Sequence, residues 1–374
     1  MSKPRKVEEK PKFYRLDAIK QYKAIYNMII GERSNGKSFS VLEEILKRYL
    51  DTGEKGAIIR RWDTDFKAQR GQQMFAGLIK AGVLTNTPWE GIQYRAGQWT
   101  LYYYDEDLEK KIYDRQPFAY AFALNTMEHD KSTNYDDVTT ILFDEFLTRN
   151  MYLPDEFVLF MNTLSTIIRY RDNVTIYMCA NTVTKDAPYF KEMGLKHIKE
   201  QTQGTIELYT YGDSELKVAV EYCASMTGQG SKKSNKYFAF DNAKLKMITS
   251  GAWEVALYPH IPVKFKPKDI RYTYFVLWED AILQCEIVRF GNYDFTYIHQ
   301  KTTELQSPDK DLIFSREDNP LKNWRKRITA PTDKRGQIIY KYFKDDKVFY
   351  QDNEIGEIMR NYLTYCKQYD IIRE

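Results

Sequence analysis

The chain has 374 residues, of which 43% are hydrophobic and 29% are charged. This composition is typical of a folded protein with two or three domains. No apolar run approaches the roughly 18 residues that a membrane-spanning helix needs, so we expect no membrane partner. A formal net charge of +4 is too small either to indicate nucleic-acid binding or to exclude it.

The chain begins with a basic segment, 1–12, which we expect to be a disordered leader. No apolar stretch follows its first charges, so we predict no secretory signal. The cysteines are scattered, without a C-x-x-C pair, so we expect reduced thiols in a cytoplasmic protein and no zinc site. They are Cys179, Cys223, Cys285 and Cys366.

Residues 31–38, Gly-Glu-Arg-Ser-Asn-Gly-Lys-Ser, match the pattern G-x-x-x-x-G-K-[ST] at every defined position. The apolar run 26–30 before them predicts a buried strand, and the spacing of apolar residues in 39–50 predicts a helix. In such a P-loop, backbone N–H groups at the helix start converge on phosphate oxygens. The sequence therefore predicts an ATP site, with a simple Gly-rich turn before a helix as the alternative.

The P-loop pattern implies a division of labour among its residues. Gly31 and Gly36 let the backbone curve around the phosphates, and Lys37 reaches the β- and γ-phosphates. Ser38 contributes its hydroxyl to Mg²⁺. The remaining residues expected to line the nucleotide are Arg33, Ser34 and Asn35.

Further β-rich runs alternate with helical segments through the first half of the chain. The runs 56–60, 139–143 and 174–180 predict a mainly parallel sheet covered by helices on both faces, a three-layer α/β domain. The alternating runs 99–104 and 117–124 predict a strand meander inserted in it. Arg60 and Arg61 follow the second strand and are close enough in sequence to bind nucleotide or acids of the same domain.

Asp144 and Glu145 directly follow the apolar run 139–143. We expect Asp144 to emerge beside the P-loop and to hold Mg²⁺ through water. Glu145 could then orient and activate the attacking water, an arrangement that marks hydrolases with an additional strand between the two motifs. The alternative is a strand that ends in two surface acids.

Asn181 follows the run 174–180, where its amide could contact both the γ-phosphate and the attacking water. A helix cap or turn is the alternative for this residue. The helix predicted over 154–170 ends near Arg169 and Arg171, cations that its dipole favours. An arginine there could also enter a neighbouring subunit's site as a finger.

The pattern becomes irregular near 194–199, and we expect a linker subdomain over 199–255 after an ATPase domain over 13–198. A second, β-rich domain is predicted over 256–374. Its predicted elements are strands at 272–278, 282–290 and 295–299 and a final helix at 354–369.

These pieces, in this order, resemble the DNA-packaging ATPases of φ29-type phages, relatives of the large terminase motor subunits. The resemblance is good over about 13–190 and weak beyond. The similar segments are 27–38, 59–61, 131–135, 140–146, Arg169-x-Arg171 and 181–190.

The resemblance implies an ATP- and Mg²⁺-dependent P-loop motor of the catalytic-glutamate type. Members form a ring, usually of five, on the portal (connector) of an empty capsid and pull double-stranded DNA through it. We expect the chain in the host cell cytoplasm, transiently on the portal, and monomeric in isolation. A packaging RNA is a further candidate partner.

Carried over by position, the resemblance makes Lys37, Ser38, Asp144 and Glu145 the hydrolytic set. It favours Arg169 over Arg171 as the finger and makes Lys131 an inter-subunit candidate. It also implies an RNase H-like, nuclease-like fold for the last domain. No convincing trio of carboxylates gathers around Glu279, Asp280 and Asp294, and two-metal cleavage needs several, so we expect the fold without cleavage.

A motor that grips any sequence must contact phosphates, with an affinity that falls as salt rises. A solvated surface is the alternative for each cationic cluster. The candidate DNA contacts are Lys232, Lys233 and Lys236 in one loop, and Lys322, Arg325, Lys326 and Arg327 near the end.

Other functions remain open at this stage. A terminase-like ATPase with an active nuclease would share the motifs, as would a nucleotide-gated DNA-binding or scaffold protein. A small-molecule kinase fits less well, because the paired acids at 144 and 145 and the separate basic domain have no place in it.

Overall fold

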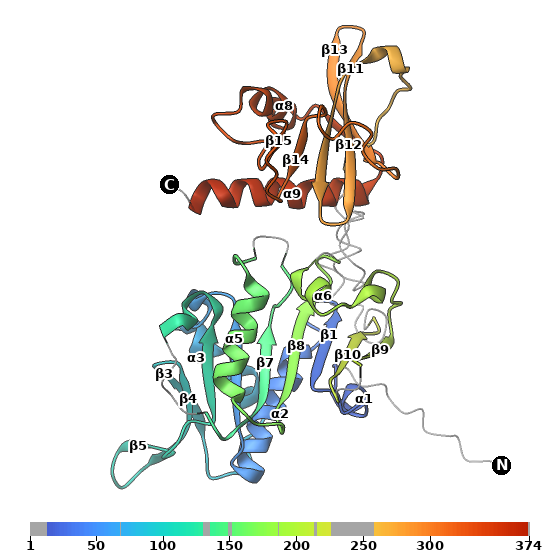
Figure 1. Cartoon of the computed structure of the whole chain (residues 1–374). Coiled ribbons are helices and arrows are strands. Elements are labelled where there is room, and N and C mark those ends of the chain that lie inside the picture. The colour runs from blue at the N-terminus through green and yellow to red at the C-terminus, as the bar shows by residue number, and fades with distance from the viewer. Residues whose placement is uncertain are drawn as a thin grey trace, which may run out of the picture. The chain divides into compact units, whose positions relative to one another are not determined.

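The computed structural model of the chain describes residues 13–67, 69–129, 135–148, 152–185, 187–212, 215–225 and 258–372. The chain divides into two compact units, with the boundary between Glu254 and Val255 (Figure 1). The expected leader, 1–12, lies outside the described residues. Every helix within the described ranges is too short or too polar to cross a membrane.

The first unit is built on a large mixed sheet, which confirms the predicted mainly parallel sheet. Within its described residues the strand order is β3-β4-β6-β2-β7-β8-β1-β10-β9, and β5 pairs with β4. The six strands from β6 to β10 in that order are parallel. The strands are β1 (Tyr26–Gly31), β2 (Lys55–Arg60), β3 (Gly91–Arg95), β4 (Gln98–Asp105), β5 (Lys110–Tyr113), β6 (Ala119–Ala123), β7 (Val138–Asp144), β8 (Thr175–Asn181), β9 (Thr205–Thr210) and β10 (Lys217–Tyr222).

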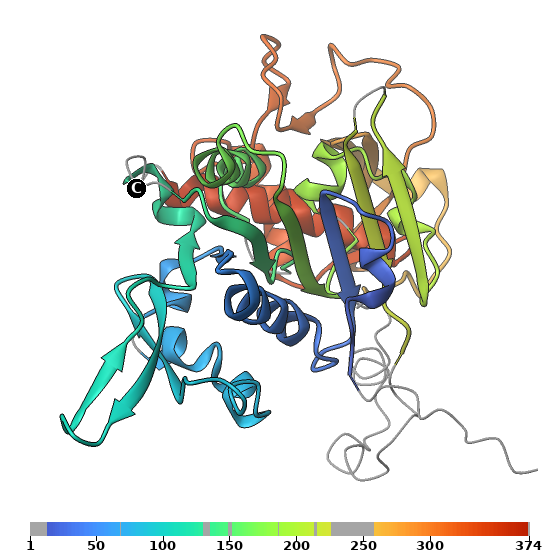
Figure 2. The same cartoon turned by 90° about the horizontal axis from the view of Figure 1, so that it is seen from below.

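Helices cover both faces of this sheet, as the apolar runs of its central strands require. Figure 2 shows α2, in blue, and α5, in green, on opposite faces. The helices are α1 (Asp17–Lys20), α2 (Lys37–Thr52), α3 (Gln69–Gln73), α4 (Ala76–Lys80), α5 (Glu156–Ile168) and α6 (Pro188–Glu192), with short 3-10 turns at Asp63–Asp65, Leu124–His129 and Lys196–Lys199.

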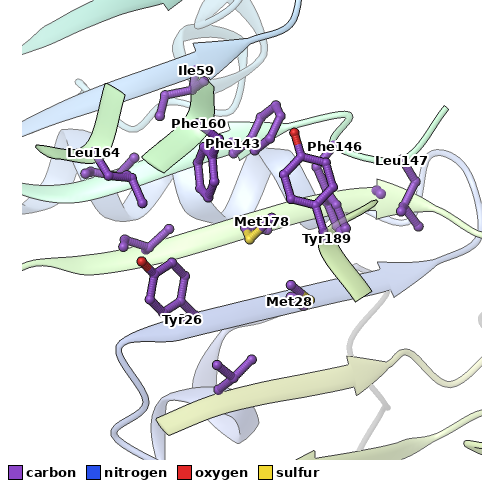
Figure 3. Close-up of a cluster of buried hydrophobic side chains, with 14 of the residues drawn as sticks. Tyr26, Met28, Ile59, Phe143, Phe146, Leu147, Phe160, Leu164, Met178 and Tyr189 are labelled. Carbon is purple, nitrogen blue, oxygen red and sulfur yellow. The ribbon is translucent and has the colours of Figure 1, made fainter. Parts of the chain in front are cut away.

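The core under α5 is aromatic (Figure 3). The ring of Phe143, on β7, lies 4.9 Å from that of Phe160, on α5, and 5.5 Å from that of Tyr189, on α6. All three side chains are fully buried. This packing anchors the helix that leads to Arg169 and the segment after Asn181 on the same sheet.

The strand order places β8 between β1 and β7. Because these strands are parallel, their carboxyl ends meet at one edge of the sheet, the usual place for a ligand in such folds. Gly31 pairs with Asn181 there, and Asp144 pairs with Cys179. The P-loop, the paired acids and Asn181 are therefore brought together by backbone pairing alone.

One expectation is wrong: the first part of the predicted linker over 199–255 belongs to the large sheet. β10 adds to β1 in parallel, and β9 pairs antiparallel with β10. The apolar core of β10, Val218–Val220, is short and flanked by charged residues, so its sequence resembles that of a polar connector. These residues are buried because β10 pairs with β1. The rest of the linker, from 226, lies outside the described residues.

The second unit has a sheet in the order β15-β14-β11-β12-β13-β16. β11, β12 and β13 are antiparallel, whereas β14 runs parallel to β11 and β15 parallel to β14. The predicted strands and final helix are confirmed. The elements are β11 (Ile270–Trp278), β12 (Ala281–Phe290), β13 (Tyr293–Gln300), β14 (Ile313–Ser315), β15 (Trp324–Arg325), α8 (Lys334–Lys344), β16 (Val348–Tyr350) and α9 (Asn353–Ile372), after a turn at Pro267–Asp269.

The final helix supplies much of the core of the second unit. Ile355, Met359, Tyr362 and Cys366 recur along α9 at helical spacing and are buried. They pack with strand residues that include Val276 and Ile298. This unit therefore has a hydrophobic core of its own.

Candidate active site

The P-loop connects β1 to α2 through a tight turn that glycine makes possible. Gly36 precedes α2 with φ +95°, and Ser34 has φ +59°, backbone conformations that glycine adopts most readily. A Cβ atom on Gly31 would lie only 2.8 Å from the Cβ atom of Cys223. Both defined glycines of the motif are thus required by the local geometry.

Lys37 points back into this loop and is buried. Its Nζ donates to the backbone oxygens of Glu32 at 2.6 Å and Gly31 at 3.3 Å, and to Asn35 Oδ1 at 3.0 Å. Burial lowers the pKa of the Lys37 ammonium, against the opposing influence of nearby anionic groups. Asn181 Oδ1 lies 3.4 Å from the same Nζ, so the structure brings these two predicted residues together.

Ser38 and Asp144 meet as the sequence predicts. The Ser38 hydroxyl donates to Asp144 Oδ1 at 2.5 Å, and Asp144 is buried at the end of β7. A hydroxyl and a carboxylate are hard oxygen donors of the kind that Mg²⁺ prefers. The residues present therefore fit the ion that the motif implies.

Arg60, the last residue of β2, bridges the two acids. Its Nη2 lies 2.5 Å from Asp144 Oδ2, and its Nη1 lies 2.9 Å from Glu145 Oε2. Burial disfavours the charged guanidinium, but the two carboxylates outweigh that effect and raise the pKa of Arg60. Of the two roles open to this arginine from the sequence, the structure shows the binding of acids.

Arg61 forms a separate, buried network. It donates to both carboxylate oxygens of Glu156, at 2.7 and 2.8 Å, and to the backbone oxygen of Phe146 at 2.8 Å. The Tyr189 hydroxyl donates to Glu156 Oε1 at 2.6 Å. The network joins the loop after Glu145 to α5 and α6. One signal for it exists in the sequence, because Glu156 is four residues before Phe160 on the apolar stripe of α5.

The two arginines after α5 differ. The Arg171 guanidinium donates to the backbone oxygens of Val138 at 2.6 Å, Tyr135 at 3.0 Å and Ile167 at 2.8 Å. Arg169 is exposed and ends the helix with φ +51°. α5 also begins two residues later than the predicted 154, because Asp155 has φ +50°. Lys131 lies outside the described residues.

A segment with no recognisable motif packs on the P-loop. The Tyr14 N–H donates to the backbone oxygen of Asn35 at 2.8 Å, and the Ser40 hydroxyl donates to the backbone oxygen of Tyr14 at 2.5 Å. The Tyr14 hydroxyl donates to Glu221 at 2.7 Å. We call residues 13 and 14 the N-terminal strap.

The predicted DNA contacts fall in two places. Lys232, Lys233 and Lys236 lie outside the described residues. Arg325, Lys326 and Arg327 line one hollow of the second unit, and Lys322 and Arg325 line another. Two acids reduce the local charge: Lys326 Nζ lies 2.7 Å from Asp318, and Arg325 Nε lies 3.6 Å from Asp333.

Comparison with known proteins identifies relatives over about half of the chain. The chain is 27% identical to a DNA packaging protein of Bacillus phage B103 over 177 residues, and this match covers 46% of this chain and 49% of the relative. It is 26% identical over 189 residues to that of Bacillus phage phi29, covering 49% and 50%. The chain thus spans about half the length of the curated relatives it matches.

Two solved structures share the fold of nearly the whole chain. The phi-29 viral genome packaging motor assembly has a TM-score of 0.57 at 17% identity and covers 97% of this chain and 99% of its own. The Phi-28 gp11 DNA packaging motor has a TM-score of 0.54 at 16% identity and covers 94% and 98%. At these identities the likeness shows the fold alone.

The family model of the podovirus DNA encapsidation protein (Gp16) matches residues 8–209. This match includes the P-loop, Arg60, the paired acids, Asn181 and the large sheet as far as β9. Since more than half of the sequence is matched, the chain belongs to the podovirus DNA encapsidation protein (Gp16) family.

Proposed function

We propose that this protein is an ATP-hydrolysing motor that moves double-stranded viral DNA into a procapsid as a ring on the portal. One observation carries the proposal: the P-loop, Asp144, Glu145 and Asn181 converge at the carboxyl ends of three adjacent parallel strands. The relatives, described as DNA packaging proteins, supply the biological setting. We place the protein in the host cytoplasm and on the portal.

The strand order supports an assignment to the P-loop NTPases of the catalytic-glutamate type, because β8 separates the P-loop strand from the strand that ends at Asp144. Residues 31–38 would cradle the phosphates with backbone N–H groups. Lys37, which now donates to carbonyl oxygens of its own loop, would donate to phosphate oxygens instead. Ser38 and Asp144 would hold Mg²⁺, which neutralises phosphate charge when it is bound.

Glu145 is suited to the role of general base. Its side chain is 64% exposed while its backbone is fixed at the end of β7. There it would accept a proton from the attacking water, a contribution of about 10²–10⁴ in rate. Asn181, beside Lys37, would contact the terminal phosphate and so register hydrolysis.

Ring formation would complete the site. Arg169 is exposed at the end of α5, where it could reach a neighbouring subunit and stabilise charge on the transferred phosphate. Arg169 is exposed whereas Arg171 is only partly exposed, which favours Arg169 as the finger. On the portal, we propose a pentameric ring in which Lys131 is an inter-subunit group and a packaging RNA is an optional partner. In isolation, the protein would be a monomer.

The second unit, from about residue 256, would be an RNase H-like domain that binds DNA without cutting it. Within its sheet, the run β13-β12-β11-β14-β15, three antiparallel strands followed by two parallel ones, supports this proposal, and β16 adds to the edge at β13. The adjacent parallel strands β11 and β14 contain no carboxylate. No three His, Cys, Asp or Glu side chains gather to hold a metal in the described part of the chain. The cations around Arg325 would contact DNA phosphates.

The decisive experiment measures the ATPase rate of the purified protein alone, with duplex DNA, and with DNA and procapsids. We expect a low basal rate that rises with DNA and procapsids and disappears in Lys37→Ala. A slow hydrolysis rate that neither DNA nor procapsids change would favour a nucleotide-gated scaffold protein. Linear or degraded plasmid in the presence of Mg²⁺ or Mn²⁺ would favour a terminase with an active nuclease.

A further inference from the structure

Arg60 reaches the paired acids because of the sheet register. Ile59 on β2 pairs with Phe143 on β7, so the next residue of each strand emerges at the same edge. There the guanidinium divides its two terminal nitrogens between Asp144 and Glu145. The side chains of Arg60 and Asp144 are only 17% and 10% exposed, so their ion pair is shielded from solvent, whereas the Glu145 side chain is 64% exposed.

Both oxygens of Asp144 are already engaged. Oδ1 accepts from Ser38, and Oδ2 accepts from Arg60. A divalent cation held by Ser38 and Asp144 would share this one carboxylate with the guanidinium, and the two positive charges would repel each other. Of the two groups on Asp144, Arg60 is the cationic one and Ser38 is neutral, so Arg60 is the partner whose charge a bound cation would replace.

The neighbouring Arg61 shows what a fixed arginine looks like in this protein. Its Nε and both terminal nitrogens donate to Glu156 and to backbone oxygens, and the Glu156 side chain has no exposed surface. Arg60, in contrast, leaves its buried Nε without a hydrogen-bond partner, and one of its acids faces solvent. A buried N–H group without a hydrogen-bond acceptor costs free energy, which favours a second arrangement of the Arg60 side chain.

From these contacts we infer that Arg60 is a positioning residue that takes the place of the metal beside Asp144 before the metal binds. It neutralises Asp144 and Glu145 until magnesium nucleotide binds, and then gives up Asp144. This inference rests on the proposed function, because it assumes that Asp144 holds Mg²⁺.

The test compares nucleotide affinity with and without metal. A fluorescent ADP analogue is titrated into the full chain in Mg²⁺ and, separately, in EDTA, and the ratio of the two Kd values is taken. In Arg60→Ala, metal no longer competes for Asp144, and bare carboxylates repel metal-free nucleotide. We expect the ratio Kd(EDTA)/Kd(Mg²⁺) to rise about tenfold above wild type. Simple structural damage would weaken both affinities alike and leave the ratio unchanged.

Three further variants sharpen this comparison. Arg60→Gln, a smaller perturbation, should raise the ratio in the same direction if Arg60→Ala folds poorly. Arg60→Lys keeps the charge but not the two-pronged guanidinium, so it should raise the ratio less than Arg60→Ala does. Lys67→Ala removes an exposed cation that pairs with Asp63 and should change nothing.

The outcomes separate the two proposals. Unchanged ratios in Arg60→Ala and Arg60→Gln, in a wild-type protein that hydrolyses ATP, would overturn this inference and leave the proposed function intact. A wild-type protein that binds no nucleotide in either buffer would overturn both. In a crystal structure with Mg²⁺ and a slowly hydrolysed ATP analogue, an intact Arg60–Asp144 pair would also overturn the exchange.

Discussion

Glu145 combines a fixed backbone with an exposed side chain. Its N–H donates to the backbone oxygen of Cys179 at 2.8 Å, and its φ of +60° is unusual for a residue other than glycine. Such conformations persist where the surroundings determine them, often at functional sites. Here the strained residue is the one that the sequence assigns as general base.

Replacement of Glu145 by Gln should leave nucleotide binding intact and slow hydrolysis by about 10²–10⁴. The amide keeps the shape of the side chain but cannot accept the proton of the attacking water. Steady-state ATPase rates and nucleotide Kd values of the purified variant check this. An undiminished rate would remove Glu145 from the role of base.

Arg169 and Arg171 form a matched pair for testing the finger. Arg169→Ala should fold and bind ATP normally but lose the hydrolysis stimulated by DNA and procapsids. Arg171→Ala should instead lower thermal stability, because it removes a hydrogen-bond donor from the backbone oxygens of Tyr135, Val138 and Ile167. Full stimulated activity in Arg169→Ala would show that the finger is elsewhere.

At the scale of elements, Arg61 and Glu156 hold the loop after β7 against α5. Removing one member of a buried ion pair leaves the other charge uncompensated, at a cost of about 3–5 kcal/mol. We expect Glu156→Ala to lower the free energy of unfolding by this amount in a denaturant titration. Glu43→Ala removes only an exposed pair with Lys47 and should cost less than about 1 kcal/mol. Similar values for both variants would contradict a structural role for the network.

A second pair links β12 to β13, where His299 Nε2 lies 3.5 Å from Glu286 Oε1. The hydrogen bond to Glu286 raises the pKa of His299 above 6.5. Burial opposes ionisation of Glu286, but the hydrogen bonds from His299 and Gln284 lower its pKa below 4.5. The contribution of the pair to stability is therefore lost as pH rises through the folded pKa of His299. It is also lost as pH falls through that of Glu286.

The second unit should thus become less stable between pH 6 and pH 8, by at most about 1 kcal/mol because His299 is partly exposed. Amide hydrogen exchange of β12 and β13, corrected for the intrinsic pH dependence of exchange, measures this change. Glu286→Gln should flatten it, whereas His197→Gln should not, because His197 and its partner Glu200 are exposed. An unaltered pH dependence in Glu286→Gln would contradict the assignment.

Elements with strong local patterns were predictable. The P-loop, β7 and the long helices combine motif, apolar run and caps within a few residues. The strands β14 and β15, three and two residues long, have no local signal and exist through pairing with β11. β10 likewise forms a strand because it pairs with β1. The contacts of Arg60 and Arg61 depend on the register between β2 and β7, which a single sequence does not determine.

At the scale of the whole molecule, the proposed grip on DNA depends on salt. Each phosphate contact contributes a slope of about −0.9 to log K against log salt. Replacing the four C-terminal cations with Ala should weaken duplex binding for every sequence and flatten the slope by up to about 3 to 4. The variant positions are Lys322, Arg325, Lys326 and Arg327.

The control replaces four exposed cations of the first unit with Ala and should leave the slope unchanged. Binding measured by fluorescence anisotropy across a salt series distinguishes the two variants. Equal slopes in both would assign the grip to another surface. The control positions are Lys20, Lys47, Lys67 and Lys80.

The sequence predicted both units of the molecule, but the boundary of the first unit only in part. The large sheet continues through β10, beyond the predicted end of the ATPase domain at residue 198. Order in the second unit rests on α9 closing over its strands, and the helix was predictable from its apolar spacing. The site residues that directly follow strands could be predicted, because parallel strands bring their carboxyl ends together.

The N-terminal strap has a practical consequence for producing this protein. Tyr14 bonds to both sides of the P-loop turn, through Asn35 and Ser40, and a Cβ atom on Gly36 would lie 3.3 Å from that of Phe13. A truncation that starts beyond Tyr14 would remove one wall of the phosphate cradle. Material made that way would understate nucleotide affinity although every motif residue was present, so affinity tags belong upstream of an intact strap.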